Sequence, residues 1–159
     1  MVCAMEIIRR SYDHPDVVAL ARRLQAEYAR IYGYPDVCRG EAAQFTPPKG
    51  RFGVGYVEGT PVVMGGWRHR IGKCAELRRM YVPDEHRGNG YSRTMLAWLE
   101  NTASACGERK MVLETNQRHP VALALFRSAG YTEVEPFGYY ADNPLTVYLG
   151  RDLPDVLGS

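Results

Sequence analysis

The stretch at residues 76–100, ELRRMYVPDEHRGNGYSRTMLAWLE, changes its hydrophobic pattern halfway along. Residues 74–82 have the composition of a β-strand. Met95 and Leu99 then belong to a helical repeat that is predicted to end at Gly107. The residues between the two patterns are Arg87-Gly88-Asn89-Gly90-Tyr91-Ser92. The stretch therefore predicts a strand that enters a helix through a glycine-rich turn.

The glycine-rich turn has the properties of a phosphate-binding site. The start of a helix leaves several backbone N–H groups without partners and carries the positive end of the helix dipole. Glycines allow the backbone to wrap closely around an anion, because no Cβ blocks the approach. The guanidinium group of Arg87 suits a pair of phosphate oxygens. We therefore predict that a polyphosphate binds here, at Arg87, Gly88, Asn89, Gly90, Tyr91, Ser92 and Arg93.

Two better-known phosphate motifs do not fit this turn. Turns of this kind often only redirect the chain, so the pattern by itself does not establish a ligand. A P-loop needs GxxxxGK followed by Ser or Thr, which the sequence lacks. A dinucleotide fingerprint needs a third glycine where Arg93 stands.

The rest of the chain extends this strand-and-helix pattern in both directions. Strands are predicted at 5–10, 51–57, 61–70, 74–82, 111–114 and 145–149, with a further short one at 131–134. A helix is predicted to start at the Asp13-His14-Pro15 signal, to include residues 17–31 and to stop near Gly33 and Pro35. Further helices are predicted around residues 95–106 and over 120–129, and residues 36–50 are expected to be irregular. The predicted fold is an α/β domain with a mixed, mostly antiparallel central sheet and helices on both faces.

Composition narrows the function classes. The 159 residues suit one domain, 1–159. A net charge of +2, with 20 basic residues scattered among 18 acidic ones, does not favour a nucleic-acid partner. The sequence has no apolar run long enough to cross a bilayer and no signal-peptide core, so we expect a cytoplasmic protein without a membrane partner. Its four cysteines and four histidines form no ligand-spaced cluster, so no metal is expected.

Two segments resemble the GNAT superfamily of N-acetyltransferases. Residues 77–82 followed by 87–92 resemble its motif A, in which a strand precedes Arg or Gln, two residues, Gly, one residue, and Gly or Ala. Residues 114–116 and 122–131 resemble its motif B, the next strand and helix. The likeness spans residues 51–149 and implies the GNAT acyl-CoA N-acyltransferase fold. It also implies an enzyme that uses acetyl-CoA (coenzyme A).

The resemblance also implies where the cofactor lies. The pantetheine arm would pair with backbone groups from Met80 through Tyr81 to Val82, and the N–H of Met80 would stabilise the oxyanion. Asn116 and Phe126 would contact the far side of the arm.

Two residues depart from the family pattern. His119 stands where the family often has an asparagine. Phe126 stands where many members have a tyrosine that protonates the leaving thiolate. Tyr131, Tyr139, Tyr140 or water would have to replace that tyrosine.

An amine must lose a proton before it can attack, and Glu76 is the predicted base or substrate anchor. Period-two alternation would put Glu76, Arg78 and Met80 on one face of the strand. The alternative is a structural ion pair between Glu76 and Arg78, Arg70 or another surface cation.

The acceptor site is predicted from the composition of a loop, which is weaker evidence than a motif. The loop at 31–52 offers aromatic and charged residues: Tyr32, Tyr34, Asp36, Arg39, Glu41 and Phe45. These would suit a small cationic amine, although the same composition fits ordinary solvent exposure. The predicted substrate-binding residues are Tyr34, Glu76, Arg78, Tyr139 and Tyr140, of which the last two would equally suit rim packing.

The sequence therefore predicts acetyl transfer from acetyl-CoA to a primary amine of a small molecule. A protein N-acetyltransferase and a non-catalytic acyl-CoA-binding regulatory module are the alternatives, the second because of His119 and Phe126. Nucleic-acid binding is the least supported. The acceptor's identity stays open, as does the oligomeric state, for which the family often adopts a homodimer.

Overall fold

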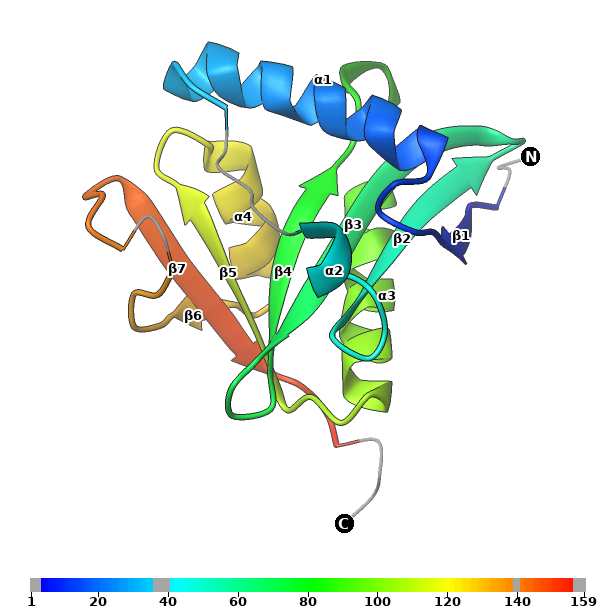
Figure 1. Ribbon diagram of the computed structural model, residues 1–159. Helices are drawn as coiled ribbons and strands as arrows, with labels where there is room; N and C mark the ends of the chain where they lie inside the picture. The colour runs from blue at the N-terminus through cyan, green and yellow to red at the C-terminus, as the bar shows by residue number, and fades with distance from the viewer. Residues whose placement is uncertain (1–3, 36–40, 139–140, 156–159) are drawn as a thin grey trace.

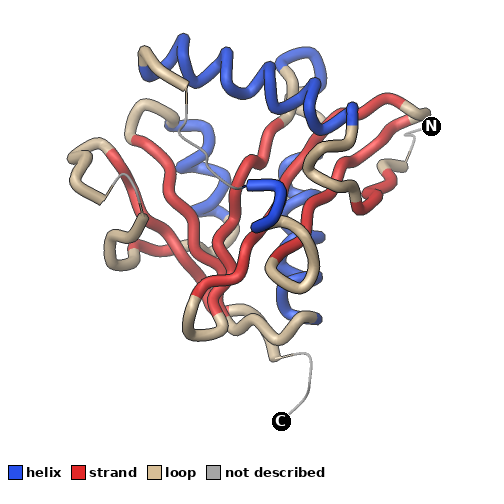
Figure 2. Tube along the Cα trace, viewed as in Figure 1, coloured by secondary structure: helices blue, strands red, loops and turns tan. Residues whose placement is uncertain are grey.

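One sheet of seven strands, in the order β1-β2-β3-β4-β5-β7-β6, runs through the computed structural model, which describes residues 4–35, 41–138 and 141–155 (Figures 1 and 2). The strands are β1 (Glu6–Arg9), β2 (Gly50–Val57), β3 (Thr60–Arg70), β4 (Cys74–Tyr81), β5 (Lys110–Asn116), β6 (Thr132–Glu133) and β7 (Thr146–Asp152). The helices are α1 (Pro15–Tyr32), α2 (Glu41–Gln44), α3 (Tyr91–Ala105) and α4 (Pro120–Ser128), with a 3-10 turn at Asp84–His86.

The sheet is mixed, as the sequence predicts. β2, β3 and β4 follow one another as antiparallel neighbours, and the only described parallel pair is β4 with β5, joined through α3. A tight turn at Glu58 and Gly59, both with positive φ, closes the hairpin between β2 and β3. The fold class is confirmed, and so is the expected element order apart from the added short helix α2.

The two faces of the sheet carry different helices. On one face, α1 packs with Val17, Leu20 and Leu24 against β2, β3 and β4, and the short α2 lies on the same side (Figure 1). On the other face, α3 and α4 cover a larger core that includes Leu99 and Phe126. Each helix therefore buries one apolar stripe against the sheet.

Helix α1 begins where the sequence predicts. His14 is its N-cap and accepts a hydrogen bond from the N–H of Asp16 at 3.1 Å, while Pro15 occupies the first helical turn. The expectation of an irregular segment before residue 50 needs correction, because Glu41–Gln44 forms a single helical turn. Within the described residues, no helix has the length and apolarity needed to span a bilayer.

A β-bulge interrupts β4. Arg79 has a positive φ of 59°, and the register with β3 jumps from Gly66–Arg78 to Met64–Tyr81. The extra residue shifts the alternation of side chains by one position. Glu76 and Arg78 consequently face the α1 side, whereas Met80 packs with the core beneath α3 and α4. The prediction that all three share one strand face is wrong for Met80.

Candidate active site

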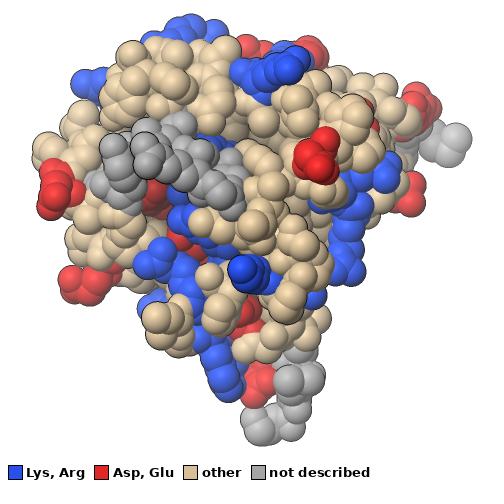
Figure 3. Space-filling model, in the orientation of Figure 1, with Lys and Arg blue, Asp and Glu red and all other residues tan. Residues whose placement is uncertain are grey.

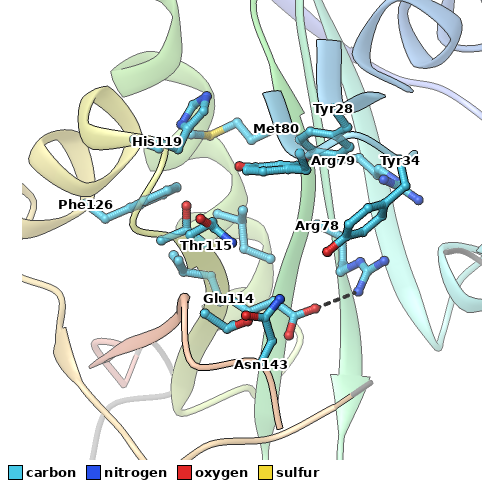
Figure 4. A pocket seen from close by; sticks show the side chains of 16 residues that line it. Tyr28, Tyr34, Arg78, Arg79, Met80, Glu114, Thr115, His119, Phe126 and Asn143 are labelled. Atoms are coloured by element: carbon cyan, nitrogen blue, oxygen red, sulfur yellow. Dashed lines mark ion pairs between the residues drawn. The ribbon is translucent and has the colours of Figure 1, made fainter. Parts of the chain in front are cut away.

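A pocket lies where two strands of the sheet separate. β4 and β5 are paired only at Cys74–Lys110, Ala75–Met111 and Glu76–Val112, although both strands continue for several residues beyond. Side chains from both strands line the resulting gap, with residues of α1 on one side and of α4 on the other (Figure 4). A parallel pair that separates exposes main-chain groups along both inner edges. The gap can therefore accept an extended ligand.

The pocket contains five of the predicted site residues: Tyr34, Arg78, Met80, Asn116 and Phe126. The other lining residues are Tyr28, Tyr32, Leu77, Arg79, Leu113, Glu114, Thr115, His119, Ala122, Asn143 and Thr146. Tyr81 and Val82 are buried, so only their backbone groups are suited to contact a cofactor.

The predicted phosphate-binding turn begins helix α3. Gly88 and Gly90 have φ values of 82° and 79°, and Gly90 is the N-cap. The first hydrogen bond of the helix runs from the N–H of Thr94 to the carbonyl of Gly90. The N–H groups of Tyr91, Ser92 and Arg93 precede it and therefore have no carbonyl acceptor within the helix. An ideal Cβ placed on either glycine would meet no atom within 4 Å. The turn is thus an open cradle of N–H groups.

Side chains of the cradle hold it in shape. The amide of Asn89 donates to the carbonyl of His86 at 3.0 Å, and Arg93 donates to the hydroxyl of Ser128 at 2.8 Å. The second contact links the first turn of α3 to α4. The cradle therefore has a defined shape before any ligand arrives.

The structure corrects the role predicted for Arg87. Its Nε donates to the carbonyl of Val82 at 2.9 Å, one terminal nitrogen donates to Glu27 at 2.9 Å, and the other lies 2.6 Å from Asp84. These contacts turn the guanidinium group toward α1 instead of presenting it as a fork for phosphate oxygens. Arg87 thus joins α1 to the cradle.

Glu76 is not in the pocket. Its side chain is 2% exposed, and its oxygens lie 3.1 Å from Arg68, 3.0 Å from Arg70 and 3.3 Å from Arg78. Glu76 is also absent from the described residues that line the pocket, so its carboxylate is not placed to reach an amine there. The ion pair that the sequence left as an alternative is the arrangement in the structure.

Among the described residues, Glu114 is the one carboxylate that lines the pocket, and the predicted site did not include it. It projects from β5 and has an oxygen 3.6 Å from Arg78, as the dashed line in Figure 4 shows. Its side chain is 13% exposed. An acidic residue at the end of an otherwise apolar strand was the available signal. The sequence could not show that β4 and β5 separate just before this position.

The tyrosines proposed to replace the family's acid fall into two groups. Tyr131 is 2% exposed and donates a 2.7 Å hydrogen bond to Glu100, and burial with this bond raises its pKa far above the ordinary value. Its ring packs on Phe126, away from the pocket, so its proposed role as an acid is wrong. Tyr139 and Tyr140 lie outside the described residues.

The acceptor side of the pocket differs in part from expectation. Tyr34 lines this side of the pocket, and so do Tyr28 and Tyr32 of α1. Figure 4 labels Tyr28 and Tyr34 there. Phe45 instead belongs to the core beneath α1, where it is 3% exposed. Asp36 and Arg39 lie outside the described residues, as does the side chain of Glu41.

His119 lies at the α4 side of the pocket. Burial lowers its pKa below the ordinary value, the nearby charge of Arg87 lowers it further, and Glu27 acts in the opposite direction. His119 is therefore held neutral near pH 7. It adds a hydrogen-bonding group to this wall without adding a charge.

A family model and a known protein each match part of this chain. A family model described as the acetyltransferase (GNAT) family matches residues 14–131. An IAA acetyltransferase of Azospirillum brasilense is 33% identical over 82 residues, 52% of this chain and 54% of that protein. The chain thus matches about half the length of this relative.

Two solved structures share the fold. A Klebsiella pneumoniae protein assigned as an acyl-CoA N-acyltransferase aligns with a TM-score of 0.82 and 23% identity, over 94% of this chain and 97% of that one. The PaiA N-acetyltransferase of Thermoplasma acidophilum, in complex with coenzyme A, aligns with a TM-score of 0.71 and 14% identity, over 94% and 99%.

Proposed function

Because the chain belongs to the acetyltransferase (GNAT) family, we propose that it moves an acetyl group from acetyl-CoA to a primary amine of a small molecule. The observation that carries this proposal is the gap between β4 and β5 beyond Glu76 and Val112, with a carboxylate on its wall. A thioester and an amine can meet in such a gap beside a proton acceptor.

The proposed cofactor position uses the cradle and the two strand edges. The diphosphate lies on the N–H groups of residues 88–93, where the dipole of α3 favours negative charge. The pantetheine arm follows the backbone of Met80, Tyr81 and Val82, with Asn116 and Phe126 on its other side. The coenzyme A complex of the Thermoplasma protein, which has the same fold, supports this choice of cofactor.

In the proposed reaction, the amine nitrogen attacks the thioester carbonyl carbon, forming the N–C bond, and the C–S bond then breaks. The N–H of Met80 stabilises the oxyanion of the tetrahedral intermediate. Glu114 takes the proton from the amine, directly or through water. Coenzyme A leaves as a thiolate and is protonated by solvent, which is reasonable for a thiol whose ordinary pKa is about 8.5.

Glu114→Gln tests the role of Glu114, and the isosteric substitution Glu76→Gln is its comparison. We expect Glu114→Gln to lower kcat by about 100-fold, because the amine loses its proton acceptor. Glu76→Gln should instead lower the free energy of unfolding by about 3 kcal/mol, because three arginines lose a buried counter-charge, and folded protein should keep its kcat.

The assay is thiol release from acetyl-CoA against a panel of amines, with urea denaturation of both variants. An unchanged kcat in Glu114→Gln would contradict the assignment of the base. No acetyl-CoA binding by calorimetry would contradict the proposed function as a whole. Turnover with a protein amine alone would leave the chemistry in place and replace the acceptor.

A further inference from the structure

The proposed site for acetyl-CoA has two parts that lie on different elements. The backbone of residues 80–82, at the end of β4, would hold the pantetheine arm, and the N–H groups of residues 88–93, at the start of α3, would hold the diphosphate. Residues 83–87 join the two parts and contain a 3-10 turn at Asp84–His86. Two binding parts reinforce each other only when their spacing matches the ligand. Contacts that fix residues 83–87 should therefore strengthen cofactor binding.

The side chain of Arg87 joins the two ends of this connecting segment. Its Nε donates to the carbonyl of Val82 at 2.9 Å, which ties the residue before the cradle back to the end of β4. A terminal nitrogen lies 2.6 Å from Asp84, and the guanidinium carbon lies 5.9 Å from the ring centre of Tyr81. An arginine side chain has many rotamers, and that of Arg87 is 44% exposed. Its orientation therefore depends on a partner that holds it.

Glu27 of α1 is a partner from a distant part of the chain. Both its oxygens accept hydrogen bonds from one terminal nitrogen of Arg87, at 3.0 and 2.9 Å, across 60 positions of sequence. Helix α1 lies wholly within the described residues, and Glu27 is its one buried charged residue. Figure 3 shows exposed charged side chains of both signs along the upper edge of the molecule, where α1 lies in Figure 1. A buried carboxylate needs hydrogen-bonded partners, so burial keeps Glu27 and Arg87 together.

A second ion pair joins the same two regions and serves as a comparison. Arg23 of α1 donates to both oxygens of Glu85, which belongs to the 3-10 turn, at 2.6 and 2.7 Å. The two side chains are 47% and 52% exposed. Exposed pairs contribute little to a fixed geometry, because water and salt screen them. The buried pair is therefore the one expected to fix the connecting segment.

We propose that Glu27 is a positioning residue for the cofactor. By holding Arg87 against the carbonyl of Val82, it keeps the two parts of the acetyl-CoA site at the spacing that one cofactor molecule needs. This inference rests on the proposed function, which supplies the cofactor. Glu27 acts through Arg87 and not through its own charge, because a carboxylate near the cradle disfavours phosphate. Loss of the carboxylate should therefore weaken binding, whereas a purely electrostatic role predicts the opposite sign.

Glu27→Gln tests the proposal with little change of shape. The Kd for coenzyme A, measured by calorimetry, should rise about 10-fold or more, because Arg87 loses its charged partner and the site loses its fixed spacing. Two fragments of the cofactor serve as internal controls in NMR titrations: ADP for the cradle and pantetheine for residues 80–82. Their Kd values should change by less than about 2-fold, because each fragment uses one part of the site only. A merely structural loss would weaken the fragments as well.

Two further variants complete the experiment. Glu85→Gln makes the same change of charge in the exposed pair and should alter the Kd for coenzyme A by less than about 2-fold. If Glu27→Gln fails to fold, Arg87→Lys takes its place. A lysine keeps the positive charge, but a single ammonium group cannot reproduce the fork that reaches both Val82 and Glu27. Arg87→Lys should therefore also weaken coenzyme A and spare the two fragments.

The results separate this inference from the proposed function. An unchanged Kd for coenzyme A in folded Glu27→Gln would overturn the inference and leave the proposed function in place. A lower Kd would show that Glu27 withholds Arg87 from the phosphates, and would overturn it too. An equal rise for coenzyme A and for either fragment would indicate damage to one part of the site, again against the inference. If the unchanged protein bound no coenzyme A, both the inference and the proposed function would be lost.

Discussion

Arg79 shows how one residue redirects a strand. Its left-handed conformation is unusual for a residue with a Cβ and costs about 1 kcal/mol or more. The resulting bulge sends Met80 to one face of the sheet while Arg78 stays on the other. The side chain of Arg79 itself lines the pocket. The bulge therefore separates the residues proposed to hold the cofactor from those proposed to hold the acceptor.

His119 carries a prediction about pH. Its pKa is lowered by burial from an ordinary value of 6.5, so the unfolded chain binds a proton at a higher pH than the folded chain does. The free energy of unfolding should therefore fall as the pH drops below about 6.5 and stop falling below the folded pKa. His119→Asn removes this titration and should flatten the profile. Urea denaturation between about pH 7 and pH 5 measures the free energy of unfolding of the unchanged protein and of His119→Asn. If this free energy depended on pH with the same slope in both proteins, the prediction would be contradicted.

Among the elements, helix α3 connects the cradle to the rest of the fold. Its N-terminus follows β4 after the short 3-10 turn, and ion pairs tie this region to α1 through Arg23–Glu85 and Arg87–Glu27. In both pairs the two carboxylate oxygens accept hydrogen bonds from the arginine. Burial distinguishes the second pair, because the side chain of Glu27 is 9% exposed and that of Glu85 is 52% exposed. These ion pairs therefore connect the cradle to α1, the helix that carries the pocket tyrosines.

Two glycines that flank α3 give a matched test of the cradle. Gly90 at its start and Gly107 after its end both have positive φ, and an added Cβ would meet no atom within 4 Å at either position. Alanine should therefore destabilise the protein by about 1 kcal/mol at each site. Only Gly90→Ala places a methyl group in the cradle, so it should raise the Kd for acetyl-CoA by about 10-fold or more. Calorimetry measures both, and equal affinities would indicate that the turn only redirects the chain.

Across the whole molecule, a single sheet carries both halves of the proposed site. The antiparallel strands β2 to β4 lie on one side of the gap with α1, and β5 to β7 lie on the other side with α4. The two halves of the sheet are paired at three positions between β4 and β5. A cofactor in the gap would add contacts to both halves.

This arrangement predicts how acetyl-CoA changes stability. At about 100 times its Kd, acetyl-CoA should raise the free energy of unfolding by about 2.7 kcal/mol, because it binds the folded chain alone. One cooperative transition is expected with and without the ligand, since one sheet spans the described residues. Urea denaturation followed by two spectroscopic probes measures this, with Gly90→Ala as the comparison. A ligand effect on only one of two separate transitions would contradict it.

The sequence alone was sufficient for the order of the elements, the mixed sheet, the family and the position of the glycine-rich turn. These features follow from local patterns: hydrophobic period, capping residues and glycines that allow positive φ. The start of α1 at His14 and Pro15 is one case, and Gly90 at the start of α3 is another.

Only the tertiary structure decided which carboxylate reaches the pocket and where Arg87 points. Both depend on contacts between residues far apart in the chain, and a period of two cannot reveal a bulge. Glu76 is held by three arginines, two of them from β3, and Arg87 is held by a glutamate 60 positions earlier. Glu114 lines the gap because β4 and β5 separate before it. A charge's role depends on its partners and its exposure, and these exist only once the chain has folded.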